Sequence, residues 1–113
     1  MKADALQMTL LYDYYGEMLT EKQRLCFDLH YNQDLSLGEI AEEMGISRQG
    51  VHDAIARTEA ALGGMEKRLG CVARAKSLQE AHRSLVEVAE QLRTAGQPDF
   101  AARILAAADL IKE

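Results

Sequence analysis

A run of polar side chains at residues 47–57 carries the donors and acceptors that nucleic-acid recognition requires. On a helix that begins after Ser47, Arg48 could reach a phosphate or a guanine, and Gln49 could pair with an adenine edge. The Ser47 hydroxyl, together with the helix N-terminus, could hold a phosphate. His52 could donate or accept a hydrogen bond in a groove, and Arg57 on the flank could contact the backbone. Arg57 could instead be a solvated charge, and a surface histidine such as His52 usually has no specific role.

Two helices joined by a short turn must position these side chains. Ser36 and Glu39 form a predicted capping box, in which the serine hydroxyl and the glutamate side chain each bond a backbone N–H. Leu35 and Ile40 occupy the staple positions around the same helix start, so two independent signals coincide. Gly45 should end this helix, because a residue just past a helix often needs the positive φ that glycine adopts without strain.

A second helix is predicted to start directly after that turn. Ser47 is its expected N-cap, with Ile46 against Val51 as its staple. Apolar residues recur at the spacing that locks one helix across the other, namely Ile40, Met44, Ile46, Val51 and Ile55. This pattern predicts a helix-turn-helix, in which the second helix presents its first turns to the major groove. An ordinary helical corner without a nucleic-acid role is the alternative.

The segment that precedes this pair of helices is also predicted to be helical. Leu6, Leu10 and Tyr14 form one apolar stripe on a helix over residues 5–15, which Gly16 can close. The three tyrosines of this segment point in different directions on a helix. Packing is therefore favoured over a stacking platform for bases.

Further signals mark the helix that follows residues 5–15 and the far end of the helix that begins after Ser47. Thr20 and Gln23 form a second predicted capping box, for a helix that ends around residues 31–33. Cys26 on that helix is interpreted as a small core residue. The helix that begins after Ser47 should fray or bend at Gly63 and Gly64 before it resumes, because glycine is a poor helix former.

Beyond Gly70 the chain predicts a helical hairpin. Two long amphipathic stripes, at 78–92 and 100–111, are separated by the linker "TAGQPD", so the helices should fold back antiparallel. The fold class is therefore all-α, with a helix-turn-helix domain at 1–70 and a hairpin at 71–113. The stripes are broader than one small core requires, which favours a homodimer through the hairpin. Satisfaction of both stripes within one chain is the alternative.

The charge distribution argues against tight, promiscuous DNA binding. The chain has a formal net charge of −5, and the whole excess lies in residues 1–70, with twelve Asp and Glu against seven Lys and Arg. Asp53 lies on the predicted reading face itself. Because phosphate neutralisation supplies most of non-specific affinity, this region is poorly equipped for it. A weak or site-specific binder, an RNA or protein contact, and a helper that gains affinity by dimerising all remain open.

The sequence contains no catalytic, metal-binding or cofactor motif, so we expect neither an enzyme nor a cofactor. Cys26 and Cys71 match no zinc or redox spacing and are too few for a disulfide scaffold. Glu42, Glu43 and the three histidines are scattered without ligand or triad spacing. No stretch approaches the roughly 20 apolar residues that span a bilayer, and a cytoplasmic protein is expected.

The stretch "LLYDYYGEMLTEKQRLCFDLHYNQDLSLGEIAEEMGISRQGVHDAIARTE" closely resembles the YlxM family of small bacterial helix-turn-helix proteins. That family in turn looks like the fourth region of bacterial sigma factors. The resemblance covers roughly residues 6–70, and "LYDYYGEMLTEKQ" followed by "LSLGEIAEEMGISRQGV" is more specific than a generic turn. Family members usually carry a bulkier residue where Gly50 stands and an aromatic residue where His52 stands. Gly50 should cost the reading helix about 1 kcal/mol against alanine.

The resemblance implies an all-helical fold, dimerisation, no catalytic residues and a regulatory or accessory role in the signal recognition particle pathway. The partners would then be DNA or the particle's RNA, and the particle's GTPase. The nucleic-acid contacts would come from Ser47, Arg48, Gln49, His52 and Arg57. The alternative is an acidic protein-interaction module that docks on the GTPase without reading DNA directly.

Overall fold

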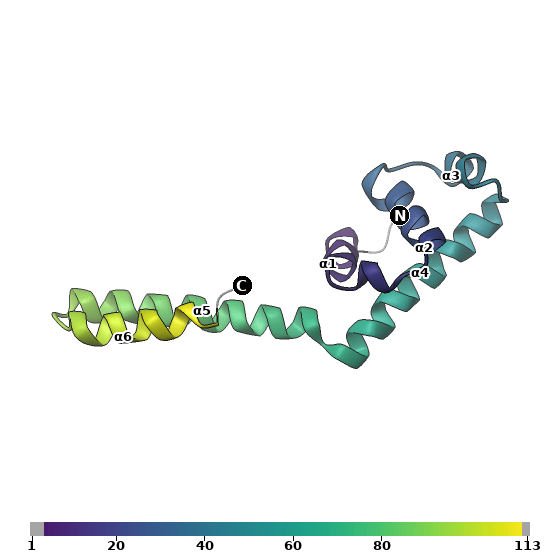
Figure 1. Cartoon of the computed structure of the whole chain (residues 1–113). Coiled ribbons are helices and arrows are strands. Elements are labelled where there is room, and N and C mark those ends of the chain that lie inside the picture. The colour runs from purple at the N-terminus through teal and green to yellow at the C-terminus, as the bar shows by residue number, and fades with distance from the viewer. Residues whose placement is uncertain (1–3, 112–113) are drawn as a thin grey trace. The chain divides into compact units, whose positions relative to one another are not determined.

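The computed structural model describes residues 4–111, and the chain is built from helices (Figure 1). Six α-helices and two short helical turns follow one another, and no strand occurs within residues 4–111. The predicted all-α fold class is confirmed. Residue contacts divide the chain into two compact units, residues 1–70 (the N-terminal unit) and residues 71–113 (the C-terminal unit).

Helix α1 (Ala5–Tyr15) has the predicted bounds but packs through a different face. Leu11 and Tyr15 are buried, whereas Leu6 is 73% exposed and Tyr14 is 43% exposed. The predicted packing stripe through Leu6 and Tyr14 is therefore wrong. The helix places Leu11 and Tyr15 toward the core because its main neighbour is the long helix of the same unit, which the local sequence of α1 does not specify.

A 3₁₀ turn, η1 (Gly16–Met18), leads into α2 (Glu21–Phe27), which continues as a π-helical turn, η2 (Asp28–Asn32). The predicted capping box is present. Thr20 Oγ1 accepts from the backbone N–H of Gln23 at 3.1 Å, and Gln23 Oε1 accepts from the backbone N–H of Thr20 at 3.0 Å. The helical run ends at residue 32, as predicted, although its last turn is wider than an α-helix.

An aromatic column ties α1 to α2 and η2. The ring of Phe27 stacks on Tyr12 with a centroid distance of 4.3 Å and on Tyr31 with a centroid distance of 4.6 Å. Such pairs contribute roughly 0.5–1.5 kcal/mol beyond the area that they bury. Beside the column, Cys26 is fully buried, which confirms its predicted place in the core. The prediction that tyrosines of α1 serve packing is confirmed for Tyr12 and Tyr15.

Helices α3 (Leu37–Met44) and α4 (Arg48–Leu69) complete the N-terminal unit. Helix α4 runs without interruption through Gly63 and Gly64, so the predicted fraying of the helix at these glycines is wrong. The helix is held on both sides of these glycines, because Leu62 is fully buried before them and Glu66 is bonded after them. Tertiary contacts therefore offset the low helix propensity of glycine.

Two tyrosines hold the long helix α4 in place. Tyr15 Oη donates to Glu66 Oε1 at 2.6 Å, and Tyr31 Oη donates to Glu59 Oε2. Burial raises the pKa of the Tyr31 phenol, and the hydrogen bond to the Glu59 carboxylate raises it further. Each phenol donates to a carboxylate that is partly withdrawn from water and so satisfies one of its acceptors.

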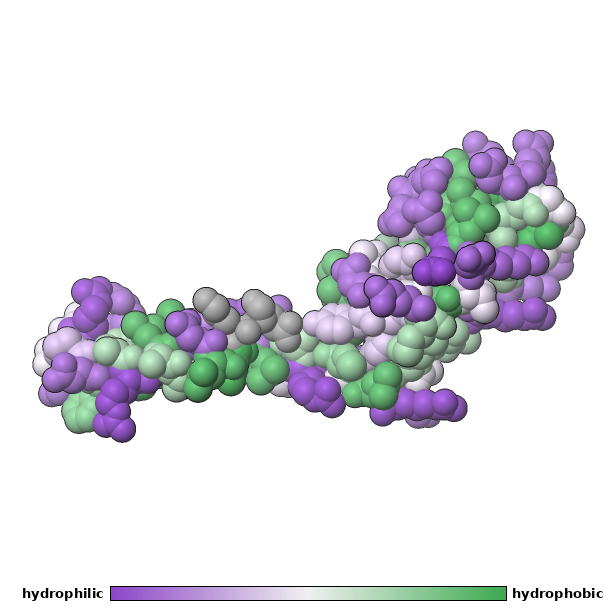
Figure 2. All heavy atoms as spheres, viewed as in Figure 1, coloured by the Kyte–Doolittle hydropathy of each residue, from purple (hydrophilic) through white to green (hydrophobic). Residues whose placement is uncertain are grey.

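The C-terminal unit is the predicted antiparallel hairpin, of α5 (Cys71–Thr94) and α6 (Pro98–Asp109). Gly96, at φ 82°, turns the chain between the helices. The hairpin interior contains the small side chains Ala89, Ala101 and Ala108. Larger apolar side chains remain exposed on its surface, and Figure 2 shows hydrophobic side chains along the visible face of the hairpin. The exposed set is Val86, Val88, Phe100, Leu105 and Leu110.

Candidate nucleic-acid interface

The turn between α3 and α4 has the geometry that a helix-turn-helix requires. Gly45 adopts φ 69° and ψ 34°, and its backbone N–H bonds to the carbonyl of Ala41. The N–H of Ile46 also bonds to that carbonyl, at 3.1 Å. A residue with a Cβ would be strained at this backbone conformation, so glycine makes the corner. The predicted end of α3 at Gly45 is confirmed.

A small apolar cluster locks α4 across α3. Leu29, Ile40 and Val51 are buried at its centre. Around this centre pack partly buried residues, namely Leu35, Ala41, Met44, Ile46 and Ile55. The predicted packing of α4 against α3 is therefore confirmed. Ile40 and Val51 are its fully buried pair, and the other predicted positions lie at the edge of the cluster. Because the cluster lies on one side of α4, the opposite side of the helix is left at the surface.

Ser47 caps the start of α4. Its Oγ accepts from the backbone N–H of Gly50 at 2.9 Å, as the predicted N-cap does. A Cβ added at Gly50 would lie 3.1 Å from this oxygen, so a larger residue would press on the cap. The serine hydroxyl can still donate its own hydrogen, because one hydroxyl both donates and accepts. Ser47 is exposed, so its O–H group remains available to donate a hydrogen bond to a ligand or to water.

Two of the predicted site residues, Gln49 and His52, lie around the carboxylate of Asp53 on the outer face of α4. Gln49 Nε2 donates to Asp53 Oδ1 at 3.0 Å, and His52 Nδ1 lies 3.7 Å from the same oxygen. The side chains of His52 and Asp53 are 67% and 54% exposed. Asp53 therefore orients Gln49 and attracts His52 when that ring is protonated, but it also presents a negative charge on the predicted reading face. A base edge would have to compete with Asp53 for the Gln49 amide.

Arg48 lies apart from this group. A Cβ added at Gly38 would lie 3.2 Å from Arg48 Nε and from Arg48 Nη2, so the guanidinium group lies over the first turn of α3. Arg48 thus extends toward α3, whereas Gln49 extends along α4. The guanidinium group of Arg48 therefore lies near the start of α3, at a different place on the surface from the Gln49 amide.

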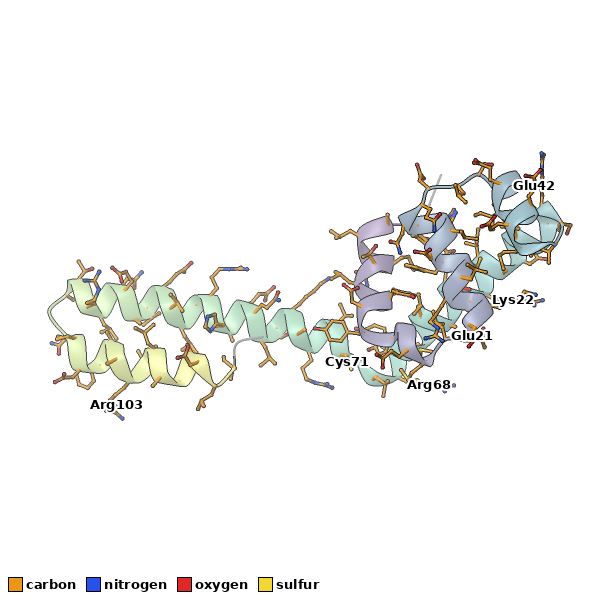
Figure 3. All side chains as sticks on the ribbon, turned by 45° about the horizontal axis from the view of Figure 1, so that its top comes forward. Glu21, Lys22, Glu42, Arg68, Cys71 and Arg103 are labelled. Atoms are coloured by element: carbon orange, nitrogen blue, oxygen red, sulfur yellow. The ribbon has the colours of Figure 1, made fainter. Side chains whose placement is uncertain are left out.

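Acidic side chains surround this surface. In the capping box of α3, the backbone N–H of Ser36 donates to Glu39 Oε1 at 2.9 Å, and this bond holds the pKa of Glu39 below its usual value. Glu42 and Glu43 are exposed on the same helix, and Figure 3 shows Glu42 on the outer side of α3. All three carboxylates would repel a phosphate backbone that approached from α3.

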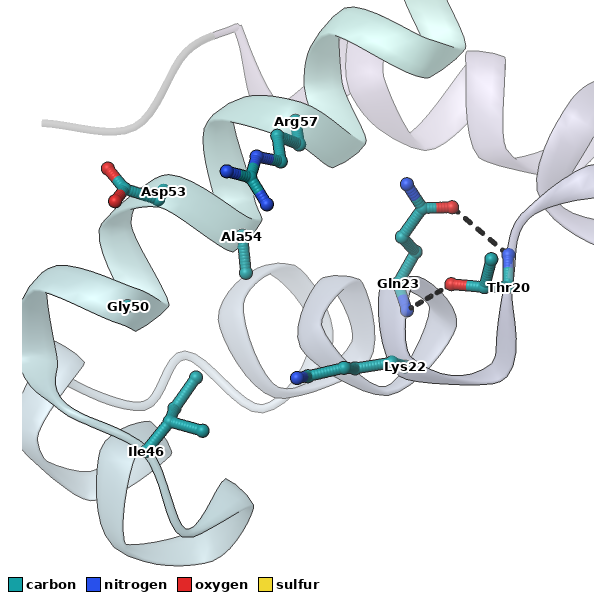
Figure 4. Close-up of a pocket in the computed structure, with 8 residues that line it drawn as sticks. All are labelled: Thr20, Lys22, Gln23, Ile46, Gly50, Asp53, Ala54 and Arg57. Carbon is teal, nitrogen blue, oxygen red and sulfur yellow. Dashed lines mark hydrogen bonds between the residues drawn. The ribbon is translucent and has the colours of Figure 1, made fainter.

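A hollow of about 410 Å³ lies between the start of α2 and the flank of α4 (Figure 4). Arg57 borders it from α4, and Lys22 borders it from α2. Its other lining residues are Thr20, Gln23, Ile46, Gly50, Asp53 and Ala54. Sequence reasoning missed Lys22, because no local pattern links it to Arg57 on a distant helix.

Two other properties bear on function. Within residues 4–111, no group of three His, Cys, Asp or Glu side chains is arranged to hold a metal ion. Among the helices of the same described part of the chain, none is long and apolar enough to cross a membrane.

The helix-turn-helix geometry agrees with the comparisons with known proteins. A family model described as "Putative helix-turn-helix protein, YlxM / p13 like" matches residues 2–98. The chain belongs to this family. The match extends past the helix-turn-helix and into the hairpin of the C-terminal unit. The resemblance to YlxM proteins inferred from the sequence is confirmed.

Several relatives of this YlxM-like chain share much of its sequence. The UPF0122 protein TTE1463 of Caldanaerobacter subterraneus subsp. tengcongensis is 49% identical over 90 residues, which cover 80% of this chain and 74% of that protein. The UPF0122 protein Teth514_1714 of a Thermoanaerobacter species is 54% identical over 74 residues, which cover 66% of this chain and 63% of that protein. The UPF0122 protein BH2485 of Halalkalibacterium halodurans is 45% identical over 89 residues, which cover 79% and 82% of the two chains.

Proposed function

We propose that this YlxM-like protein is a nucleic-acid-binding regulatory protein that reads a duplex with the first turns of α4. One observation carries the proposal: the buried pair Ile40 and Val51 locks α4 across α3 and leaves the opposite side of α4 exposed. In a helix-turn-helix protein this is the arrangement that presents side chains to a groove. Gln49 and His52 would contact bases, while Ser47, Arg48 and Arg57 would contact phosphates.

The acidic surface of the N-terminal unit implies weak or site-specific binding. Few phosphates can be neutralised by seven basic residues that are mixed with twelve acidic ones. Binding by two copies would compensate, because a dimer presents two reading helices to one duplex. This requirement leads to the second part of the proposal, a homodimer.

The homodimer would form through the hairpin of α5 and α6. The side chains buried in the hairpin are alanine-sized where the two helices meet, while Phe100 and Leu105 are 52% and 44% exposed. A second hairpin would bury these side chains in a four-helix bundle. Light scattering should show a dimer that dissociates on dilution, and Leu105→Glu should shift the equilibrium toward the monomer. A wild-type mass that stays monomeric at every concentration would rule the dimer out.

The biological setting that we propose is the cytoplasmic signal recognition particle pathway, and it rests on the resemblance to the YlxM family. The particle's RNA or DNA would be the nucleic acid. The acid surplus of residues 1–70 favours one alternative, in which this unit docks on a basic surface of the particle's GTPase without reading DNA. A pull-down with that GTPase at low and high salt tests the alternative, because an electrostatic contact weakens as salt rises. Neither version requires catalytic residues or a cofactor.

The reading role is tested with an Arg48→Ala/Gln49→Ala double variant. Fluorescence anisotropy would measure its binding to nucleic acid that co-purifies with the native protein. A matched control, Gln79→Ala/Arg83→Ala, makes the same chemical changes at exposed positions of α5. We expect the first variant to lose at least tenfold in affinity, which corresponds to about 1.4 kcal/mol, and the control to bind like the native protein. Equal affinity of both variants would exclude the reading face.

A further inference from the structure

The hollow between α2 and α4 has the features of a phosphate site. Lys22 and Arg57 come from two different helices, and in Figure 4 both extend toward the space between those helices. Gln23 Oε1 is taken by the capping box, so the amide nitrogen of Gln23 is the part of that side chain left to donate. Gly50 and Ala54 also line the hollow, and neither has a side chain large enough to fill it. The hollow thus combines two cations with a neutral donor and room for a group the size of a phosphate.

The two cations are available to a ligand. Asp53 stands one turn before Arg57, where an ion pair along the helix would be ordinary. Instead, the Asp53 carboxylate accepts from Gln49 at 3.0 Å, and Figure 4 shows it pointing away from α2. Neither Lys22 nor Arg57 forms an ion pair with another residue in the described part of the chain. The hydrogen bond from Gln49 holds the Asp53 carboxylate away from α2, and the hollow is therefore lined by two cations and one carboxylate, which leaves it a net positive charge.

The place of the hollow favours a backbone phosphodiester over other anions. It borders the exposed side of α4, and Arg57 lies eight residues after Gln49 on the same helix. That separation is roughly 12 Å along the helix axis, at 1.5 Å per residue. The major groove is about 12 Å wide. A helix with Gln49 against the bases would therefore bring Arg57 and the neighbouring α2 to the phosphates at the groove's edge.

We propose that the hollow binds one backbone phosphodiester of a nucleic-acid duplex, held by Lys22 and Arg57 from opposite sides. The inference rests on the proposed function and adds α2 to the interface. It assigns Arg57 to a site separate from the Gln49 and His52 group. Lys22 and Arg57 are positioning residues, because a phosphate contact sets the register of the protein on the duplex and carries no sequence information.

The salt dependence of binding tests this proposal. Anisotropy titrations over 50–300 mM salt would use random-sequence DNA and RNA duplexes of 20 base pairs with native protein, Lys22→Ala, Arg57→Ala and the double variant. Each single variant should reduce the slope of log K against log salt by up to about 0.9 for the one phosphate contact, on every sequence. A loss on DNA only, RNA only or both identifies the source of the phosphodiester, and each of these results supports the site.

Matched controls are available on the same helix as Arg57. Lys67→Ala and Arg68→Ala remove the same charges from exposed positions near the end of α4. Arg57 and Arg68 are separated by roughly 16 Å along the helix. If the controls reduce the salt slope as much as Lys22→Ala and Arg57→Ala do, the effect is one of general charge, and the proposal is overturned. Unchanged tyrosine fluorescence would show that each variant is folded.

The outcomes separate this inference from the proposed function. If Arg48→Ala/Gln49→Ala weakens binding while Lys22→Ala and Arg57→Ala keep the native slope, the reading role stands and the phosphate site fails. If only the Lys22 and Arg57 variants alter binding, the phosphate site stands and the reading role fails. Native protein that binds neither random-sequence duplex overturns the phosphate site, and the reading role is then decided by the titration with co-purifying nucleic acid. A polyglutamate competitor that displaces the duplex as well as an equal charge of inorganic polyphosphate would show a site for acidic protein and overturn the phosphodiester proposal.

Discussion

Replacement of Ile40 by alanine should lower the free energy of unfolding of the N-terminal unit by about 2–4 kcal/mol. Ile40 is fully buried against Leu29 and Val51 at the joint of α3 and α4. The change removes three carbon atoms, at roughly 0.8 kcal/mol each, and leaves a cavity that adds to the cost. Alanine is the better helix former, but this offsets only a few tenths of a kcal/mol. A unit of this size has a total stability of about 4–10 kcal/mol, so the loss is large.

Tyrosine fluorescence during urea unfolding can measure this loss in the N-terminal unit alone. The chain has four tyrosines, no tryptophan and no tyrosine beyond residue 31, so the C-terminal unit contributes no signal. Ile40→Val removes a single carbon and should cost about 1 kcal/mol. Leu37→Ala, at a position that is 37% exposed in the first turn of α3, is the control and should cost less than about 1 kcal/mol. The packing argument is refuted if Ile40→Ala costs no more than Leu37→Ala.

Three further predictions concern stability. Ser47→Ala should cost about 1 kcal/mol by removing the N-cap of α4, while Ser47→Asn should cost much less; equal losses in urea unfolding would refute the cap. His82→Ala removes the 3.0 Å contact of Nδ1 with the Ala108 carbonyl, and amide exchange at the end of α6 should accelerate there but not at the start of α5. Stability should fall as pH rises above about 9, because burial raises the pKa of the Cys26 thiol above its usual 9.0 and that of the Tyr31 phenol above its usual 10.0. The folded chain keeps protons that the unfolded chain releases, so the free energy of unfolding falls by at most about 1.4 kcal/mol per pH unit for each group. Cys26→Ala should reduce this dependence on pH.

Local signals in the sequence predicted the helix boundaries well. The capping boxes that begin at Thr20 and Ser36, the N-cap at Ser47 and the corner at Gly45 all occur as predicted. Each depends on residues within one helical turn, so neighbours in the sequence are enough to decide it. The same reasoning explains why the helix-turn-helix and its buried pair could be predicted before the rest of the packing.

Distant contacts decided the features that the sequence did not predict. Which face of α1 is buried depends on α4, which is remote in sequence, and so Leu11 rather than Leu6 lies in the core. The glycines at 63 and 64 continue a helix because contacts on either side of them hold it, although glycine alone favours a break. The wide last turn at residues 28–32 likewise follows no local signal.

For the candidate site, the sequence by itself determined a helix-turn-helix with Ser47, Gln49 and His52 on an exposed side of its second helix. The spacing of apolar residues sets that face, since helical periodicity is a local property. Only the tertiary structure decided that Lys22 borders the same hollow as Arg57. Only the folded side chains show that Asp53 bonds Gln49 and leaves Arg57 unpaired within residues 4–111. Side-chain pairing and convergence between helices depend on how the chain folds back, and no sequence spacing encodes them.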